Sequence, residues 1–180
     1  MSVTRTLVLG GVKSGKSRHA QQLAESYDDV VFIATARAGD AEMQQRIDRH
    51  RKDRPATWHV IEEPRYLVEQ LQTVQADAAS ARSPLVLVDC LTLWLTQLCS
   101  EDLSADELHT ECERLAHQVA EVTYPLILVS NELNMGVTPL GEFSRRYCDA
   151  AGLMHQRIAD VCDTVTLVVA GLPMPLKPRD

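Results

Sequence analysis

Short hydrophobic runs recur along the chain, separated by longer stretches in which hydrophobic and charged residues follow helical spacing. Five runs predict β-strands, at residues 7–9, 30–34, 85–88, 126–129 and 165–169. A weaker run at residues 57–61 predicts a further strand at an edge of the sheet. Strands that are hydrophobic on both faces are typical of a parallel sheet covered by helices. The pattern therefore predicts an α/β fold with three layers and a mostly parallel central sheet.

Helical periodicity fills the stretches between these runs. It predicts helices at residues 16–27, 40–53, 65–79, 91–99, 104–122 and 142–163. Ser104 and Glu107 match the capping box that begins many helices. The sequence contains no internal repeat and no linker-like segment, so residues 1–180 are expected to form a single domain.

Composition narrows the functional classes. The chain has 180 residues, 45% hydrophobic content and a formal net charge of −7, which favour a soluble globular protein and disfavour nonspecific binding to nucleic acid. It has neither a signal-peptide pattern nor a hydrophobic run long enough to span a membrane, so a cytoplasmic protein without a transmembrane segment is expected. The five cysteines are scattered without a CxxC pair, which predicts buried thiols rather than disulfides or a zinc site.

A glycine-rich segment joins the first predicted strand to the first predicted helix. Residues 10–17 read GGVKSGKS and match the GxxxxGKS pattern of a phosphate-binding loop. In such a loop, backbone N–H groups and the N-terminus of the following helix surround the phosphates. Lys16 is expected to reach the β- and γ-phosphates, and Ser17 to hold Mg²⁺. The residues predicted to bind a nucleoside triphosphate are Gly10, Gly11, Val12, Lys13, Ser14, Gly15, Lys16 and Ser17.

A carboxylate, Asp89, directly follows the hydrophobic run at residues 85–88. Because the carboxyl ends of parallel strands meet at one edge of a sheet, Asp89 is expected near the phosphate loop. There it would orient Mg²⁺ directly or through water, as a Walker B carboxylate does. The alternative is an ordinary acidic residue in a loop after a buried strand.

A basic segment contains a candidate nucleophile. Arg46, His50 and Arg54 are spaced by four residues and would share one face of a helix. A histidine beside two guanidinium groups tends to remain neutral, and the neutral imidazole is the nucleophilic form. Taken alone, the segment is more typical of a solvated, charged helix end before Pro55 than of a nucleophile site.

Two further segments, residues 130–139 (SNELNMGVTP) and 151–157 (AGLMHQR), complete a recognisable pattern. Together with the phosphate loop and the segment around His50, they resemble the bifunctional adenosylcobinamide kinase/adenosylcobinamide-phosphate guanylyltransferase family across nearly the whole chain. One departure is His155, which stands where the family pattern has asparagine.

The resemblance implies a P-loop NTPase fold of the RecA-like type, with His50 as a histidine that becomes guanylylated. It also implies that residues 34–36 and 51–54 line the nucleotide site and that Glu62 and Asp89 contact the nucleotide. A carboxylate can accept hydrogen bonds from both N1–H and the exocyclic amino group of guanine, and either Glu62 or Asp89 could do so. The nucleotide-binding residues beyond the loop would thus be Ala34, Thr35, Ala36, Arg51, Lys52, Asp53, Arg54, Glu62 and Asp89.

The resemblance further implies two reactions. Adenosylcobinamide, a corrinoid, would be phosphorylated by ATP or GTP, and GMP would then pass from GTP through His50 to give adenosylcobinamide-GDP. Mg²⁺ would assist, no protein-bound cofactor is expected, and the protein would be a homo-oligomer, with a trimer as one candidate. Two alternatives remain: a P-loop small-molecule kinase without a covalent intermediate, and a non-enzymatic GTP-binding regulator.

Overall fold

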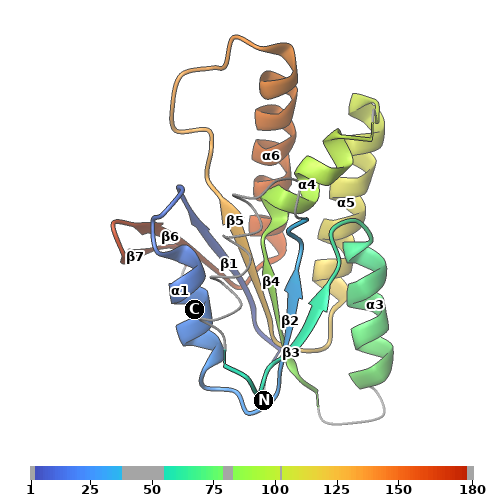
Figure 1. Ribbon diagram of the computed structural model, residues 1–180, viewed down its shortest axis with the longest axis vertical. Coiled ribbons are helices and arrows are strands. Elements are labelled where there is room, and N and C mark those ends of the chain that lie inside the picture. The colour runs from blue at the N-terminus through green and yellow to red at the C-terminus, as the bar shows by residue number, and fades with distance from the viewer. Residues whose placement is uncertain (1–2, 38–54, 79–82, 102, 178–180) are drawn as a thin grey trace.

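A seven-stranded sheet forms the centre of the computed structural model, which describes residues 3–37, 55–78, 83–101 and 103–177 (Figure 1). The strand order is β3-β2-β4-β5-β1-β6-β7, and every neighbouring pair is parallel except β6 with β7. The strands are β1 (Arg5–Gly10), β2 (Val30–Ala34), β3 (His59–Glu62), β4 (Leu85–Asp89), β5 (Leu126–Asn131), β6 (Thr164–Val169) and β7 (Leu172–Lys177).

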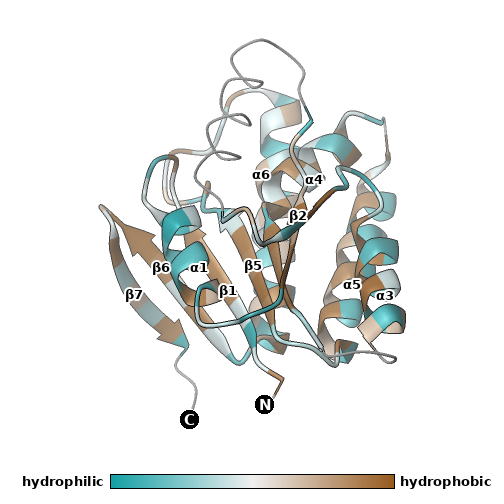
Figure 2. Cartoon of the chain, turned by 60° about the horizontal axis from the view of Figure 1, so that its bottom comes forward, coloured by the Kyte–Doolittle hydropathy of each residue, from teal (hydrophilic) through white to brown (hydrophobic). Residues whose placement is uncertain are grey.

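Helices cover both faces of this sheet and separate two hydrophobic cores. Because side chains alternate along a strand, Val8, Phe32 and Leu87 pack on the face that α1 covers, whereas Leu7 and Ile33 face the other helices. In Figure 2 the central strands are mostly hydrophobic, while α1 and α5 mix hydrophobic and hydrophilic positions. The predicted three-layer α/β fold is confirmed. The helices are α1 (Lys16–Ala24), α3 (Leu67–Ala78), α4 (Leu91–Cys99), α5 (Ala105–Glu121) and α6 (Glu142–Val161).

Six of the seven strands were predicted, and β7 was missed. Its sequence, LPMPLK, carries two prolines, which argue against a strand in the interior of a sheet. The structure places it at the edge, beyond β6, where missing N–H donors are tolerated. The β6–β7 turn consists of Ala170 and Gly171, whose φ angles of 52° and 80° suit a two-residue hairpin.

The predicted helices are found within a few residues of their expected bounds, except the one at residues 40–53, which lies outside the described residues. The predicted capping box is confirmed: Glu107 N–H donates to Ser104 Oγ at 3.2 Å, and Ser104 N–H donates to the Glu107 carboxylate at 2.8 Å. All five cysteines are free thiols, and only Cys148 is not fully buried. No helix in the described ranges combines the length and hydrophobicity that crossing a membrane requires.

Candidate functional site

The carboxyl ends of the parallel strands bring the predicted nucleotide residues to one edge of the sheet. Asn131 of β5 lies opposite Gly10 of β1, and Ala34 of β2 lies between Asp89 of β4 and Glu62 of β3. With about 4.8 Å between strands, Asp89 lies two strands, or about 10 Å, from β1. Glu62 lies four strands, or about 19 Å, from β1. The strand end that carries Asp89 is therefore closer to the phosphate loop than the strand end that carries Glu62.

The glycine-rich segment forms a tight loop between β1 and α1. Lys13 and Gly15 both have positive φ angles, 58° and 96°, so the chain turns sharply just before the helix begins. Ser14 N–H donates to Gly11 O at 3.2 Å, and the Lys16 ammonium folds back to donate to the same carbonyl at 3.2 Å. Only 9% of Lys16 is exposed. The segment thus forms the tight turn expected of a phosphate-binding loop, and the Lys16 ammonium lies against its backbone.

Two parts of the fold hold the loop in place. A Cβ atom at Gly10 would lie 2.7 Å from Val168 O and would also clash with Ser14 Oγ, so this position has no room for a side chain. Gly171, in the β6–β7 turn, donates its N–H to Ser14 O at 2.8 Å. The hairpin that sequence reasoning missed thus supports the phosphate loop. Its local signal was the Ala170–Gly171 pair between two extended segments.

The ends of β2 and β4 are joined by the side chain of Thr35. Its hydroxyl donates to Cys90 O at 2.6 Å and accepts from Cys90 N–H at 2.8 Å, and its own N–H donates to Asp89 O at 3.3 Å. Thr35 is 1% exposed. Thr35 was predicted to line the nucleotide site, and its hydroxyl hydrogen-bonds the backbone of Cys90, the residue after Asp89. Burial raises the pKa of the Cys90 thiol to about 11, so this neighbouring thiol stays protonated at neutral pH.

A polar cluster ends β5, the strand that separates β1 from β4. Glu132 N–H donates to Gly10 O at 3.0 Å, which ties the cluster to the start of the phosphate loop. The Asn131 amide donates to Thr92 Oγ1 at 2.9 Å, and Ser130 Oγ lies 2.7 Å from His155 Nε2 in a buried hydrogen bond. Sequence reasoning used residues 130–139 only as a family motif and missed this arrangement, which depends on contacts with α4 and α6.

His155 is buried inside α6 and faces Glu132. It is 6% exposed, and its Nδ1 lies 3.8 Å from Glu132 Oε2, too far for a hydrogen bond. Among the described residues, Nδ1 has no hydrogen-bond partner. Burial lowers the pKa of His155, and the Glu132 carboxylate opposes that shift. The imidazole is therefore neutral at pH 7 and accepts from the Ser130 hydroxyl when its proton sits on Nδ1.

The predicted nucleophile segment falls outside the described residues. This applies to His50 and to Arg51, Lys52, Asp53 and Arg54. After that segment, the ring of Trp58 stacks on Phe32 with 6.2 Å between centroids. The remaining predicted residues, which the structure does describe, lie in the loop or at the strand ends.

The fold and this site define a P-loop nucleotide-binding α/β protein. The loop follows a central strand, a carboxylate ends a strand two positions away, and a helix begins at Lys16. Comparison with known families gives a more specific result. The family model described as cobinamide kinase / cobinamide phosphate guanyltransferase matches residues 6–176. The chain belongs to this family, which confirms the predicted family and the predicted class of bifunctional, nucleotide-using enzyme.

Three curated relatives agree with this assignment. The bifunctional adenosylcobalamin biosynthesis protein CobP of Pseudomonas aeruginosa is 53% identical over 174 residues, covering 96% of this chain and 97% of the relative. The proteins named CobU with the same description, from Escherichia coli and Salmonella typhimurium, are 33% and 34% identical. Each match covers 95% of this chain and 98% of the relative.

Proposed function

We propose that this chain phosphorylates adenosylcobinamide with ATP or GTP and then transfers GMP from GTP to the product, giving adenosylcobinamide-GDP. The observation that carries this proposal is the formed phosphate loop in a chain that matches a bifunctional kinase and guanyltransferase family over residues 6–176. The names of the relatives, which describe bifunctional proteins of adenosylcobalamin biosynthesis, support the same substrates.

The triphosphate binds the loop from Gly10 to Ser17. Its backbone N–H groups and the N-terminus of α1 supply partial positive charge, and Lys16 leaves its present acceptor, Gly11 O, to contact the β- and γ-phosphates. Exchange of a neutral carbonyl for phosphate oxygens strengthens the hydrogen bond, because both partners are then charged. The same loop serves both reactions.

Ser17 and Asp89 are suited to hold Mg²⁺. Ser17 lies in the first turn of α1, and Asp89 ends β4 about 10 Å from β1, so a hydroxyl and a carboxylate face the same edge of the sheet. Both donors are oxygen, which Mg²⁺ prefers, and the ion commonly needs only one or two protein ligands because phosphates and waters complete its shell. When bound, the ion neutralises charge on the phosphates.

The strand separations support a division between the two candidate carboxylates. Asp89 is near enough to the loop to act with the phosphates, whereas Glu62 lies about 19 Å from β1, at the far end of the site. We assign guanine recognition to Glu62, which would accept hydrogen bonds from N1–H and the exocyclic amino group. Ala34, the last residue of β2, lies between them, and Ala34 and the following Ala36 would contact the nucleotide through backbone groups.

His50 is the proposed acceptor of GMP, and residues 51–54 complete its surroundings. An imidazole nitrogen attacks the α-phosphorus of GTP, a P–N bond forms, and the bond to the α–β bridging oxygen breaks to release pyrophosphate. A phosphate oxygen of adenosylcobinamide phosphate then attacks the same phosphorus and restores the imidazole. Nearby arginine guanidinium groups would stabilise the charge that develops on pyrophosphate.

We also propose a cytoplasmic homo-oligomer, with a trimer as the candidate to test. One observation that supports self-association is the exposed face of β7, where Leu172, Met174 and Leu176 are 68%, 50% and 55% exposed. Hydrophobic side chains that alternate on one face of an edge strand are typical of an interaction surface.

Intact-mass analysis after incubation with GTP and Mg²⁺ tests the proposal. The wild-type protein should gain one GMP, in a bond that is stable in alkali and labile in acid, localised to the peptide that contains His50. His50→Ala and His50→Asn should lose the adduct, whereas the exposed-histidine control His117→Ala should keep it. If phosphorylated corrinoid forms but no adduct ever does, the enzyme is a kinase without a covalent intermediate. If corrinoid is neither phosphorylated nor guanylylated, the proposal is wrong.

A further inference from the structure

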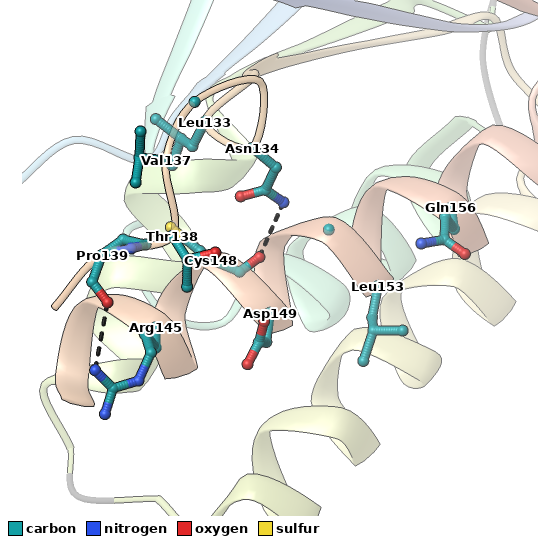
Figure 3. A pocket seen from close by; sticks show the side chains of 12 residues that line it. Leu133, Asn134, Val137, Thr138, Pro139, Arg145, Cys148, Asp149, Leu153 and Gln156 are labelled. Atoms are coloured by element: carbon teal, nitrogen blue, oxygen red, sulfur yellow. Dashed lines mark hydrogen bonds between the residues drawn. The ribbon is translucent and has the colours of Figure 1, made fainter. Parts of the chain in front are cut away.

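A cavity of about 600 Å³ lies between α6 and the segment that leads from β5 into α6 (Figure 3). This segment, residues 132–141, extends beyond the sheet at the top of Figure 1. The Asn134 amide donates to Cys148 O of α6 at 3.0 Å, and Arg145 of α6 donates to Pro139 O at 3.3 Å. The helix and the segment are thus joined near both ends, so the cavity between them is a formed part of the fold.

One wall of the cavity continues along the chain to a residue that contacts the phosphate loop. Leu133 and Asn134 line it, and the residue before them, Glu132, donates its N–H to Gly10 O at 3.0 Å. Gly10 is the first residue of the phosphate loop, and β5 is the direct neighbour of β1. A molecule in the cavity would therefore approach bound triphosphate from the side of β5.

The lining combines hydrophobic surface and neutral amides with two charged side chains, Arg145 and Asp149. Val137 and Leu153 are 95% and 50% exposed, and Asn134 and Gln156 place amide groups on the same walls. A corrinoid ring has the matching chemistry, because its edge carries methyl groups and amide side chains. Methyl groups would cover the hydrophobic side chains, and amides would pair with amides as both donors and acceptors.

We propose that this cavity holds the edge of the corrinoid acceptor in the kinase reaction, with Glu132, which directly precedes the lining residues Leu133 and Asn134, as the base. This inference rests on the proposed function. The acceptor hydroxyl oxygen attacks the γ-phosphorus, and the bond from that phosphorus to the β–γ bridging oxygen breaks. The nucleoside diphosphate leaves with the electron pair, and the hydroxyl proton passes to Glu132 Oε2 and on to solvent.

The contacts of Glu132 fit this role. Its Oε1 accepts the Asn134 N–H at 2.6 Å, which ties the carboxylate to a residue that lines the cavity. Its Oε2 lies 3.8 Å from His155 Nδ1 and has no hydrogen bond to the part of the chain that the structure describes. His155 is held in place by the hydrogen bond between its Nε2 and Ser130 Oγ at 2.7 Å. Because its ring lies beside Glu132 Oε2, His155 acts as a positioning residue that limits where Oε2 can lie.

Cavity-filling variants test the binding site. Val137→Trp should raise the KM for corrinoid at least about tenfold and weaken cobinamide binding in equilibrium dialysis, with KM for the nucleotide unchanged. Leu23→Trp, a matched change at an exposed hydrophobic position on α1, should leave both values unchanged. If Val137→Trp binds cobinamide like the wild type, the cavity is not the acceptor site. If corrinoid affinity survives while the sedimentation coefficient of Val137→Trp falls, the cavity belongs to a subunit interface, and the inference is equally overturned.

Glu132→Gln tests the base while keeping an acceptor for Asn134 N–H. It should lower kcat of phosphorylation about 10²-fold or more, with little change in corrinoid KM and normal formation of the GMP adduct. His155→Asn should lower kcat less, and the double variant should lose little more than Glu132→Gln, because both changes act on one carboxylate. A wild-type kcat in Glu132→Gln, or additive losses in the double variant, would overturn the assignment. These results differ from failure of the proposed function, in which the wild-type protein itself would phosphorylate no corrinoid.

Discussion

Replacement of Thr35 by valine should destabilise the protein, because it leaves the backbone N–H of Cys90 unpaired and removes one of the hydrogen bonds to Cys90 O. Valine keeps the shape of threonine and removes the hydroxyl, which bonds Cys90 O at 2.6 Å and Cys90 N–H at 2.8 Å. Thr35 is 1% exposed, so water cannot replace the lost partner without opening the fold. The unpaired N–H of Cys90 costs about 1–3 kcal/mol. Cys90 O keeps the N–H groups of Leu93 and Trp94 as donors, so its lost hydrogen bond costs only about 0.5–1.5 kcal/mol, and the expected loss in the free energy of unfolding is about 2–4 kcal/mol.

Thr35→Ser is the matched control. Serine keeps both hydrogen bonds and removes one buried methyl group, which should cost about 1 kcal/mol. Urea denaturation followed by tryptophan fluorescence gives the midpoint and slope for all three proteins, and an unchanged slope shows that the difference lies in stability. The valine variant should unfold at clearly lower urea than the serine variant.

Enzymatic activity should also be lower in Thr35→Val than in Thr35→Ser, because the Thr35 hydroxyl holds the backbone next to Asp89. If Thr35→Val is as stable as Thr35→Ser, the hydroxyl does not join β2 to β4 as described. A variant of normal stability that has lost affinity for GTP would indicate that the Thr35 hydroxyl contacts the nucleotide instead.

Three further outcomes are expected. Lys16→Ala should fold normally and lower kcat of both reactions about 10²-fold or more, and near-normal kinetics would contradict the role of the loop. Because burial lowers the pKa of His155 below its unfolded value of about 6.5, the unfolded state binds the proton first on acidification, so the free energy of unfolding falls as the pH drops below 7. His155→Asn should reduce this slope in urea titrations between pH 7 and 5, whereas His117→Asn, at an exposed site, should not. Ser104→Ala should cost about 1 kcal/mol by removing the cap that Glu107 completes, and an unchanged urea midpoint would argue against it.

Features with a local signal were predicted well. The phosphate loop, the capping box at Ser104 and the hydrophobic strands each depend on neighbouring residues, and each is present where expected. Strand β7 was missed because its prolines, at positions 173 and 175, are acceptable only at a sheet edge, and an edge is defined by the whole fold.

Features that join distant residues could not be read from the sequence. Gly171 supports Ser14 from a turn near the other end of the chain, and His155 meets Glu132 only because α6 packs beside the end of β5. Thr35 was predicted to line the nucleotide site, and its hydrogen bonds to Cys90 of a different strand end were not predicted. In each case the missing information was tertiary packing.

The central claim is that one GMP passes through the enzyme on its way to the corrinoid. The most direct measurement isolates protein carrying labelled GMP, removes free GTP, and adds adenosylcobinamide phosphate in a single turnover. We predict that label leaves the protein at a rate at least equal to steady-state turnover and appears stoichiometrically in adenosylcobinamide-GDP. If the labelled protein is inert toward the corrinoid phosphate, or releases GMP only to water, the covalent route through His50 is contradicted.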